Sequence, residues 1–135
     1  MKVSVIDLGF NSLKLVSYDV RQNNSFSLYE QRSVPSRLGE GLSETGFLRP
    51  EPVRRTIKAL KEFREITNLE SITQVLPIAT SAVREAANRG QFLKQVRQET
   101  GFRFRVLSAS FTLSSSSPDN SCVIFPSLIA YALSH

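Results

Sequence analysis

One short segment near the N-terminus, VIDLGFNSLKLVSYDV (residues 5–20), constrains the fold of this 135-residue chain more than any other. Two runs rich in Val, Ile and Leu, residues 2–8 and 13–20, have the composition of β-strands. Between them lie Gly9 and Asn11, which are residue types that favour tight turns. The segment therefore predicts a β-hairpin at the start of the chain.

Strands and helices alternate in the rest of the predicted fold. A turn at residues 23–24 leads to a third strand over about 26–34, which is followed by a glycine-rich loop, SRLGEGLSETG. The remaining elements expected are, in chain order, a helix over about 52–67, a strand over 72–79, a helix capped by Thr80 or Ser81, a helical stretch over 91–99 and a strand over 102–107. The order βββαβαβ predicts an α/β fold with a mixed five-stranded sheet, built from a hairpin meander and two helical crossovers.

The helix expected over 52–67 has two different faces. Its apolar residues recur at helical spacing and are expected to pack on the sheet: Val53, Ile57, Leu60 and Phe63. Its basic residues are expected to lie in solvent: Arg54, Arg55, Lys58, Lys61 and Arg64. A nucleic-acid interface is an alternative interpretation of the basic face. We do not expect one, because Glu62 and Glu65 interleave with the basic residues and no aromatic stacking platform accompanies them.

Composition narrows the class of protein. A hydrophobic content of 41% suits one compact domain, and the single Cys122 excludes an internal disulfide framework and fits a reducing compartment. Asp7 interrupts the first apolar run too early for a signal peptide. The longest apolar stretch, residues 122–133, is too short to cross a bilayer. We therefore expect a soluble cytoplasmic protein with no membrane partner.

The charge of the chain is unevenly distributed. The net charge of +5 favours anionic partners, yet residues 109–135 contain no Lys or Arg and only one acidic residue, Asp119. The serine-rich run SASFTLSSSSPDNS begins where the charge ends. This break predicts a boundary near Ser108, between a folded domain at residues 1–108 and a largely irregular tail at 109–135. Within that tail, a short helix is expected from Pro126 onward.

Two segments have the composition of anion-binding sites. The turn after the first strand would point backbone N–H groups into one concavity, where Gly9 allows close approach and Asp7 can hold a cation. In IATSAVREAANR, a strand runs into a helix whose first turn carries Arg84, which suits phosphate. Each segment also has a simpler interpretation: an ordinary hairpin turn with a surface Asp, and a solvated Arg paired with a neighbouring Glu.

Four segments in this order and spacing, VIDLGFNSLKLV, RLGEGL, ATSAVREAANRGQFL and TGFRFRVLS, resemble the exopolyphosphatase and guanosine pentaphosphate phosphohydrolase family (Ppx/GppA). The resemblance covers roughly residues 2–108. It implies a ribonuclease-H-like half-domain of the actin-like ATPase superfamily, the first of two that normally close over a phosphate cleft. Residues 1–108 would then be the N-terminal phosphate-binding domain of such a protein.

The resemblance also implies roles for individual residues. The motif DLG-x-NS is the first phosphate-binding loop of the family, and Gly9, Asn11 and Ser12 match it, while Asp7 would help to place Mg²⁺. Phe10 departs from the small Ser or Thr that is usual there, although its backbone N–H could still donate.

The remaining implied residues come from two other motifs. In T-S-A-x-R-x-A, Arg84 matches the phosphate-binding arginine, and we expect the helix start from Ser81 to Arg84 to meet the first loop at one anion site. RLGEGL, with Arg37 and Glu40, matches a loop near the substrate channel of the family.

The family hydrolyses the terminal phosphoanhydride of polyphosphate or of guanosine pentaphosphate, usually with a divalent metal, so these anions are the implied partners.

After VLS the family usually reads GEEEA, which supplies its catalytic Glu, but this chain reads VLSASFTLSSSSPDN and has no Glu after Glu99. The second phosphate loop, Asp-x-Gly-Gly-Gly, is also missing. A frameshift or a truncated gene model is our hypothesis for this departure.

Three functions follow as interpretations. The first is a phosphohydrolase-family domain that is inactive as this chain, the second is a phosphate- or polyphosphate-binding module without catalysis, and the third is the nucleic-acid binder described above. Phosphate release separates the first two. The sequence does not fix the oligomeric state, and a homo-oligomer stays open.

Overall fold

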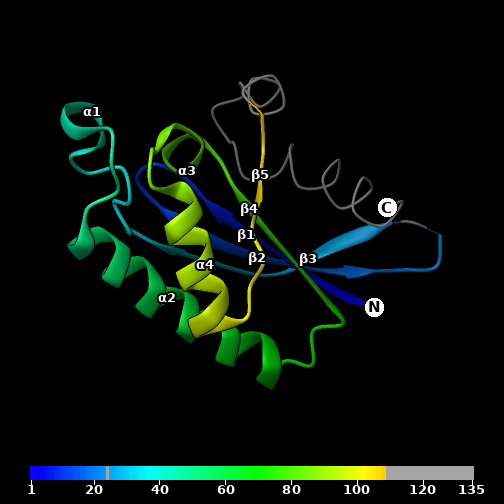
Figure 1. Cartoon of the computed structure of the whole chain (residues 1–135). Coiled ribbons are helices and arrows are strands. Elements are labelled where there is room, and N and C mark those ends of the chain that lie inside the picture. The colour runs from blue at the N-terminus through cyan, green and yellow to red at the C-terminus, as the bar shows by residue number, and fades with distance from the viewer. Residues whose placement is uncertain (24, 109–135) are drawn as a thin grey trace.

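The computed structural model describes residues 1–23 and 25–108, which fold around one mixed β-sheet (Figure 1). Its strands are β1 (Lys2–Leu8), β2 (Leu13–Val20), β3 (Phe26–Val34), β4 (Gln74–Ala79) and β5 (Arg105–Val106). The expected tail at 109–135, with its short helix after Pro126, lies outside the described residues.

The strand order in the sheet is β3-β2-β1-β4-β5. β1 pairs antiparallel with β2, as the predicted hairpin requires, and β2 pairs antiparallel with β3. β4 pairs parallel with both β1 and β5, because α-helical connections carry the chain back to the same edge of the sheet. The mixed five-stranded α/β sheet predicted from the sequence is therefore confirmed.

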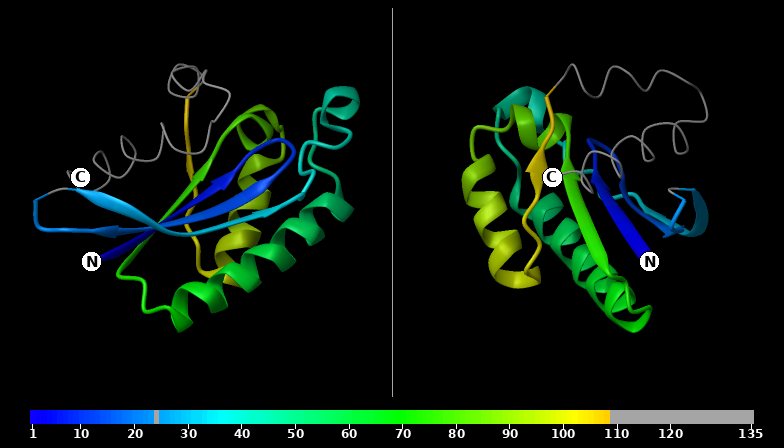
Figure 2. Two further views of the ribbon diagram at one scale, coloured as in Figure 1. Left: turned by 180° about the vertical axis from the view of Figure 1, so that it is seen from behind. Right: turned by 90° about the vertical axis from the view of Figure 1, so that its right-hand side faces the viewer.

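Four helices connect the strands: α1 (Leu42–Thr45), α2 (Pro50–Leu69), α3 (Ser81–Glu85) and α4 (Arg89–Thr100). The two long helices, α2 and α4, run side by side on one face of the sheet (Figure 2). Within the part of the chain that the structure describes, no helix combines the length and the apolar character needed to cross a membrane.

The main core lies between the sheet and these helices. Ile57, Leu60 and Phe63 are at most 4% exposed, whereas the side chains of Arg54 and Lys58 lie in solvent. The apolar face of α2 packs in one cluster with residues from β1, β2 and α4, among them Ile6, Leu8, Leu13, Leu15, Phe92 and Val96. The predicted orientation of α2 is confirmed, except that Arg55 is half-buried and donates to the Ser36 carbonyl and to Glu40 instead of lying free in solvent. A second cluster belongs to the other face of the sheet and contains Val3, Val5, Val16, Tyr18, Val20, Ile78 and Leu107.

Three local predictions were wrong. The glycine-rich loop contains the short helix α1, which begins after Gly41 and ends before Gly46, both of which have positive φ. β5 is shorter than the strand expected over 102–107, since only its two residues pair with β4. Thr80 occupies the N-cap position of α3, but it makes no side-chain cap.

Candidate phosphate-binding site

The parallel pairing of β1 and β4 brings two loops to one edge of the sheet. Leu8 and Ala79 are partners at the carboxyl ends of these strands, so residues 9–12 and Thr80 follow them side by side. The Thr80 N–H donates to the Leu8 carbonyl at 3.1 Å, and its hydroxyl is 3.4 Å from the same oxygen. The hydroxyl is therefore used between strands instead of capping α3.

The turn at residues 9–12 is closed by one main-chain hydrogen bond, from the Gly9 N–H to the Ser12 carbonyl, at 3.0 Å. The φ of Gly9 lies outside the left-handed region. A Cβ at this position would lie 3.4 Å from the Ser12 carbonyl oxygen, which is an ordinary van der Waals contact. Neither the backbone conformation nor the space around residue 9 therefore requires glycine.

The RLGEGL loop is attached to this turn by its main chain. The Gly39 N–H donates to the Phe10 carbonyl at 2.9 Å, and the Arg37 N–H donates to the Asn11 carbonyl at 3.0 Å. The Phe10 ring packs against Gly39, where a Cβ would lie 2.5 Å from three ring carbons. The phenylalanine that departs from the family pattern thus lies against the loop and the main core, and it requires glycine at position 39.

Glu40, expected near a substrate channel, is held by α2. Arg55 donates from Nη2 to Glu40 Oε2 at 3.1 Å and from Nε to the Ser36 carbonyl at 2.9 Å. Arg37, at the start of the loop, has a φ of 51°. The Glu40 carboxylate is thus paired with a cation of α2 while remaining 53% exposed.

The Arg84 side chain donates to one main-chain carbonyl, and the Arg84 carbonyl accepts from another arginine. Its Nη1 donates to the Leu107 carbonyl at 3.1 Å, just beyond β5, and Arg89 Nη1 donates to the Arg84 carbonyl at 2.7 Å. Among the described residues no acidic side chain pairs with Arg84, contrary to the simpler interpretation of this arginine. The helix that starts at Ser81 has only five residues, so its dipole adds little to the local field.

Asp7 is the carboxylate nearest the turn in sequence. Its Oδ1 is buried and has no hydrogen-bond partner among residues 1–23 and 25–108. Burial raises the pKa of this carboxyl, while the charge of Lys14, its partner residue on β2, acts in the opposite direction. An ionised oxygen kept from water without a donor is energetically unfavourable unless a ligand joins it.

Asp7 can bind Mg²⁺ only together with ligands from outside this region, such as water and substrate phosphates. No group of three or more His, Cys, Asp or Glu residues capable of holding a metal occurs in residues 1–23 and 25–108. Mg²⁺ commonly keeps several waters and binds one or two carboxylates together with substrate phosphates. Asp7 suits that role, because its orphaned oxygen lies at the start of the turn.

Sequence reasoning missed Thr80, Gly39 and Arg55 as parts of this region. Thr80 directly precedes the SAVRE segment, so its position at the edge of the sheet was implied by the strand-to-helix pattern. Nothing in the sequence indicates the contacts of Gly39 with Phe10 or of Arg55 with Glu40, because they join segments that only the fold brings together.

A family model described as the Ppx/GppA phosphatase family matches residues 5–110. The chain belongs to this family. Among curated Ppx/GppA relatives, a bifunctional 3-dehydroquinate synthase/phosphatase of Fusobacterium nucleatum is 32% identical over 109 residues, which are 76% of this chain and 16% of that protein. Exopolyphosphatase 1 of Mycobacterium leprae is 29% identical over 107 residues, 79% of this chain and 32% of that protein.

A solved Ppx/GppA structure agrees with this membership. The Ppx/GppA phosphatase of Aquifex aeolicus superposes with a TM-score of 0.77 at 29% identity, over 81% of this chain and 36% of that one. The shared architecture supports the ribonuclease-H-like, actin-like half-domain expected from the motifs. The chain thus spans about a third or less of the length of these Ppx/GppA proteins.

Proposed function

We propose that this chain is the half-domain of a Ppx/GppA phosphohydrolase that binds the terminal phosphates of polyphosphate or guanosine pentaphosphate. Relatives named as exopolyphosphatases support the substrate class. In the proposal, the N–H groups of Phe10, Asn11 and Ser12 bind phosphate oxygens and Arg84 adds a charge-assisted contact.

The buried, unpartnered Oδ1 of Asp7 carries this proposal. Of the described residues, Glu30, Ser36, Thr56 and Glu70 also bury an unpartnered side-chain oxygen, but only that of Asp7 lies at the start of the turn. Mg²⁺ bound between Asp7 and the phosphates would neutralise charge on the transferred group. The protein's own contribution is to hold the carboxylate ready beside the turn.

Gly9 supports the same interpretation. The fold has space for a Cβ at residue 9. In the proposal, glycine is needed there because it lets a ligand approach the backbone closely. Arg84 uses one of its five N–H donors on Leu107, and the others stay available for an anion in the described part of the chain.

We propose binding without turnover for this chain by itself. Phosphoryl transfer to water needs a group that orients or deprotonates the water, and such assistance is worth about 10²–10⁴-fold. Glu40 pairs with Arg55, and the sequence holds no Glu beyond Glu99. The non-catalytic phosphate-binding module is thus the form of the proposal that this chain supports.

Calorimetric titration with tripolyphosphate and Mg²⁺ tests the proposal. Arg84→Ala should weaken binding by about 1.5–3 kcal/mol, since one charge-assisted contact is lost. Arg103→Ala, which removes an exposed arginine away from the turn, is the matched control and should leave the affinity unchanged.

Equal affinity of wild type and Arg84→Ala would reject the site. Phosphate release from polyphosphate or guanosine pentaphosphate should equal that of a control without protein. Turnover that Arg84→Ala abolishes would show that a base is present after all. The cytoplasmic location and the homo-oligomer stay predictions.

A further inference from the structure

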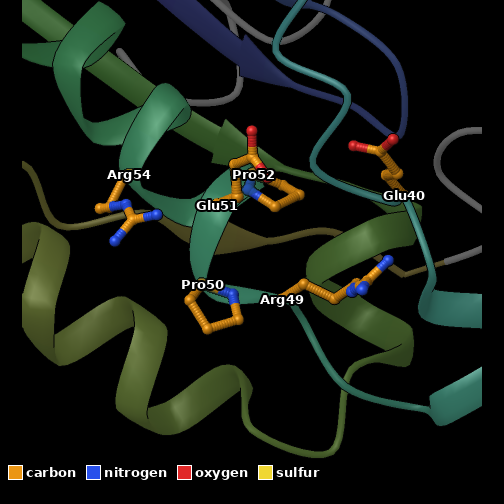
Figure 3. A pocket seen from close by; sticks show the side chains of 6 residues that line it. All are labelled: Glu40, Arg49, Pro50, Glu51, Pro52 and Arg54. Atoms are coloured by element: carbon orange, nitrogen blue, oxygen red, sulfur yellow. The ribbon is translucent and has the colours of Figure 1, made fainter.

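Two surface hollows follow α2 away from the candidate site. The first has a volume of 280 Å³ and is lined by Glu40, Arg49, Pro50, Glu51, Pro52 and Arg54 (Figure 3). The second lies between α2 and α4, has a volume of 370 Å³ and is lined by Arg54, Ile57, Lys58, Lys61, Gln95 and Glu99. Arg54 lines both hollows, which therefore adjoin at its side chain, and we call the two hollows together the α2 tract.

The α2 tract begins next to the candidate site. Figure 3 shows Glu40 and Arg54 on opposite sides of the first hollow. Glu40 directly follows Gly39, whose N–H bonds to the Phe10 carbonyl at 2.9 Å. The first hollow therefore lies at the loop that is bonded to the turn of residues 9–12.

The α2 tract carries an excess of positive charge. Two of its acidic residues are already neutralised, because Glu40 pairs with Arg55 at 3.1 Å and Glu99 pairs with Lys61 at 3.5 Å. Within the described residues, Arg54 and Lys58 make no ion pair and no side-chain hydrogen bond. These two cations are thus available to an anionic ligand, with Glu51 as the remaining acidic neighbour.

The spacing of the cations suits an extended ligand. Arg54, Lys58 and Lys61 are four and three residues apart, so they lie along one side of α2. At a rise of 1.5 Å per residue, the row covers about 10 Å of the helix axis. A chain of repeated negative charges can contact such a row at several points, whereas a single phosphate can contact only one.

We propose that the α2 tract binds the distal part of a long inorganic polyphosphate whose terminal phosphates lie in the candidate site. This inference rests on the proposed function and extends it to the length of the substrate. Inorganic polyphosphate suits the tract better than single-stranded nucleic acid, because no aromatic side chain of the described residues lines either hollow to serve as a stacking surface for bases.

Competition binding with two probes tests the inference: tripolyphosphate and long-chain inorganic polyphosphate, each titrated into the full chain. The variant is Arg54→Gln/Lys58→Gln. The matched control is Lys94→Gln/Arg97→Gln, which removes the same charge from exposed positions of α4 outside the hollows. Thermal melts of all three proteins confirm that they are folded.

The α2 variant should bind long-chain polyphosphate about threefold to tenfold more weakly and with a smaller salt dependence, and tripolyphosphate as wild type does. The α4 control should change long-chain binding by less than about twofold. An equal loss of affinity for long-chain polyphosphate in both variants, or no loss in the α2 variant, would contradict binding along the α2 tract. An oligo-dT of matched charge that displaces polyphosphate equally well would overturn the choice of ligand.

The design separates this inference from the proposed function. If Arg84→Ala weakens tripolyphosphate binding but Arg54→Gln/Lys58→Gln leaves long-chain binding unchanged, the candidate site stands and the tract fails. If tripolyphosphate binding is insensitive to Arg84, the proposed function fails first, and the inference fails with it.

Discussion

The two ends of β1 place buried carboxyl oxygens in different surroundings. At the carboxyl end, the Oδ1 of Asp7 is enclosed without a partner. Near the other end, Glu30 of β3 and Glu70, just beyond α2, each bury an Oε2 that also lacks a hydrogen-bond partner among the described residues, but here the two carboxyl groups face each other. A hydrogen bond between these two groups requires one shared proton, because two ionised carboxylates have no donor between them.

The pKa values follow from this difference. The hydrogen bond between the two glutamates raises the pKa of Glu70 and lowers that of Glu30, which Arg32 also contacts at 2.6 Å. Burial alone raises the pKa of Asp7. By sharing a proton the two glutamates can supply their own donor, whereas the Oδ1 of Asp7 is left for an external ligand. An acidic group that the fold does not satisfy is a better indicator of function than an acidic group as such.

Helix α2 connects the two regions, the surroundings of Asp7 and the glutamate pair. Arg55, in its second turn, contacts the RLGEGL loop beside the turn of residues 9–12, and Glu70 follows its last residue. The predictions below therefore perturb one end at a time, each against a matched control.

The largest expected effect is at the loop end. Gly39→Ala places a methyl group against the Phe10 ring and should lower the free energy of unfolding by about 1–3 kcal/mol. It should also weaken tripolyphosphate binding, because the loop and the turn are joined there. Gly90→Ala, in α4 with no atom near its added Cβ, should be neutral or stabilising. Chemical denaturation measures both, and equal effects would show that Phe10 does not hold the loop.

The second largest effect is expected at Asp7, which has no carboxyl neighbour in the described part of the chain like that of the Glu30–Glu70 pair. Asp7→Asn removes the unfavourable buried charge and should raise the free energy of unfolding at pH 7 by about 1 kcal/mol, while weakening binding of tripolyphosphate with Mg²⁺. Because the folded pKa of Asp7 lies above 3.8, wild-type stability gains from this group as the pH falls through the folded value toward 3.8. The variant lacks that gain.

Asp19→Asn is the control for Asp7, since Asp19 lies on the neighbouring strand and its carboxylate is 49% exposed. It should shift the stability by less than about 1 kcal/mol and leave anion binding intact. A destabilised Asp7→Asn protein would mean that the fold already satisfies Asp7.

The smallest effect tests the shared proton. In Glu70→Gln, the amide donates to Glu30 without a titrating proton. The folded wild type should lose stability as the pH rises through the raised pKa of Glu70, whereas the variant should not, and the difference should stay below about 1 kcal/mol. Glu62→Gln, on the exposed side of α2, should keep the wild-type slope. Parallel slopes for wild type and Glu70→Gln from pH 4 to 8 would exclude the shared proton.

Periodicity predicted most of the fold because it depends on local side-chain order. The strands of the hairpin and the buried face of α2 were expected from spacing alone, and the family motifs singled out the turn and Arg84 as anion-binding groups. The limits of β5 could not be predicted in this way, since only pairing with β4 defines that strand. The five-residue length of α3 could not be predicted from periodicity either.

By itself, the sequence determined the order of elements, the apolar face of α2 and the chemical types at the candidate site. Only the tertiary structure decided which of those groups are satisfied. Thr80 and Leu8 are 72 residues apart, and Arg84 and Leu107 are 23 apart, yet each pair is joined by a hydrogen bond. Which polar atoms are buried and hydrogen-bonded depends on such contacts between distant residues, which the linear sequence does not specify. In the described fold, no such contact reaches the Oδ1 of Asp7.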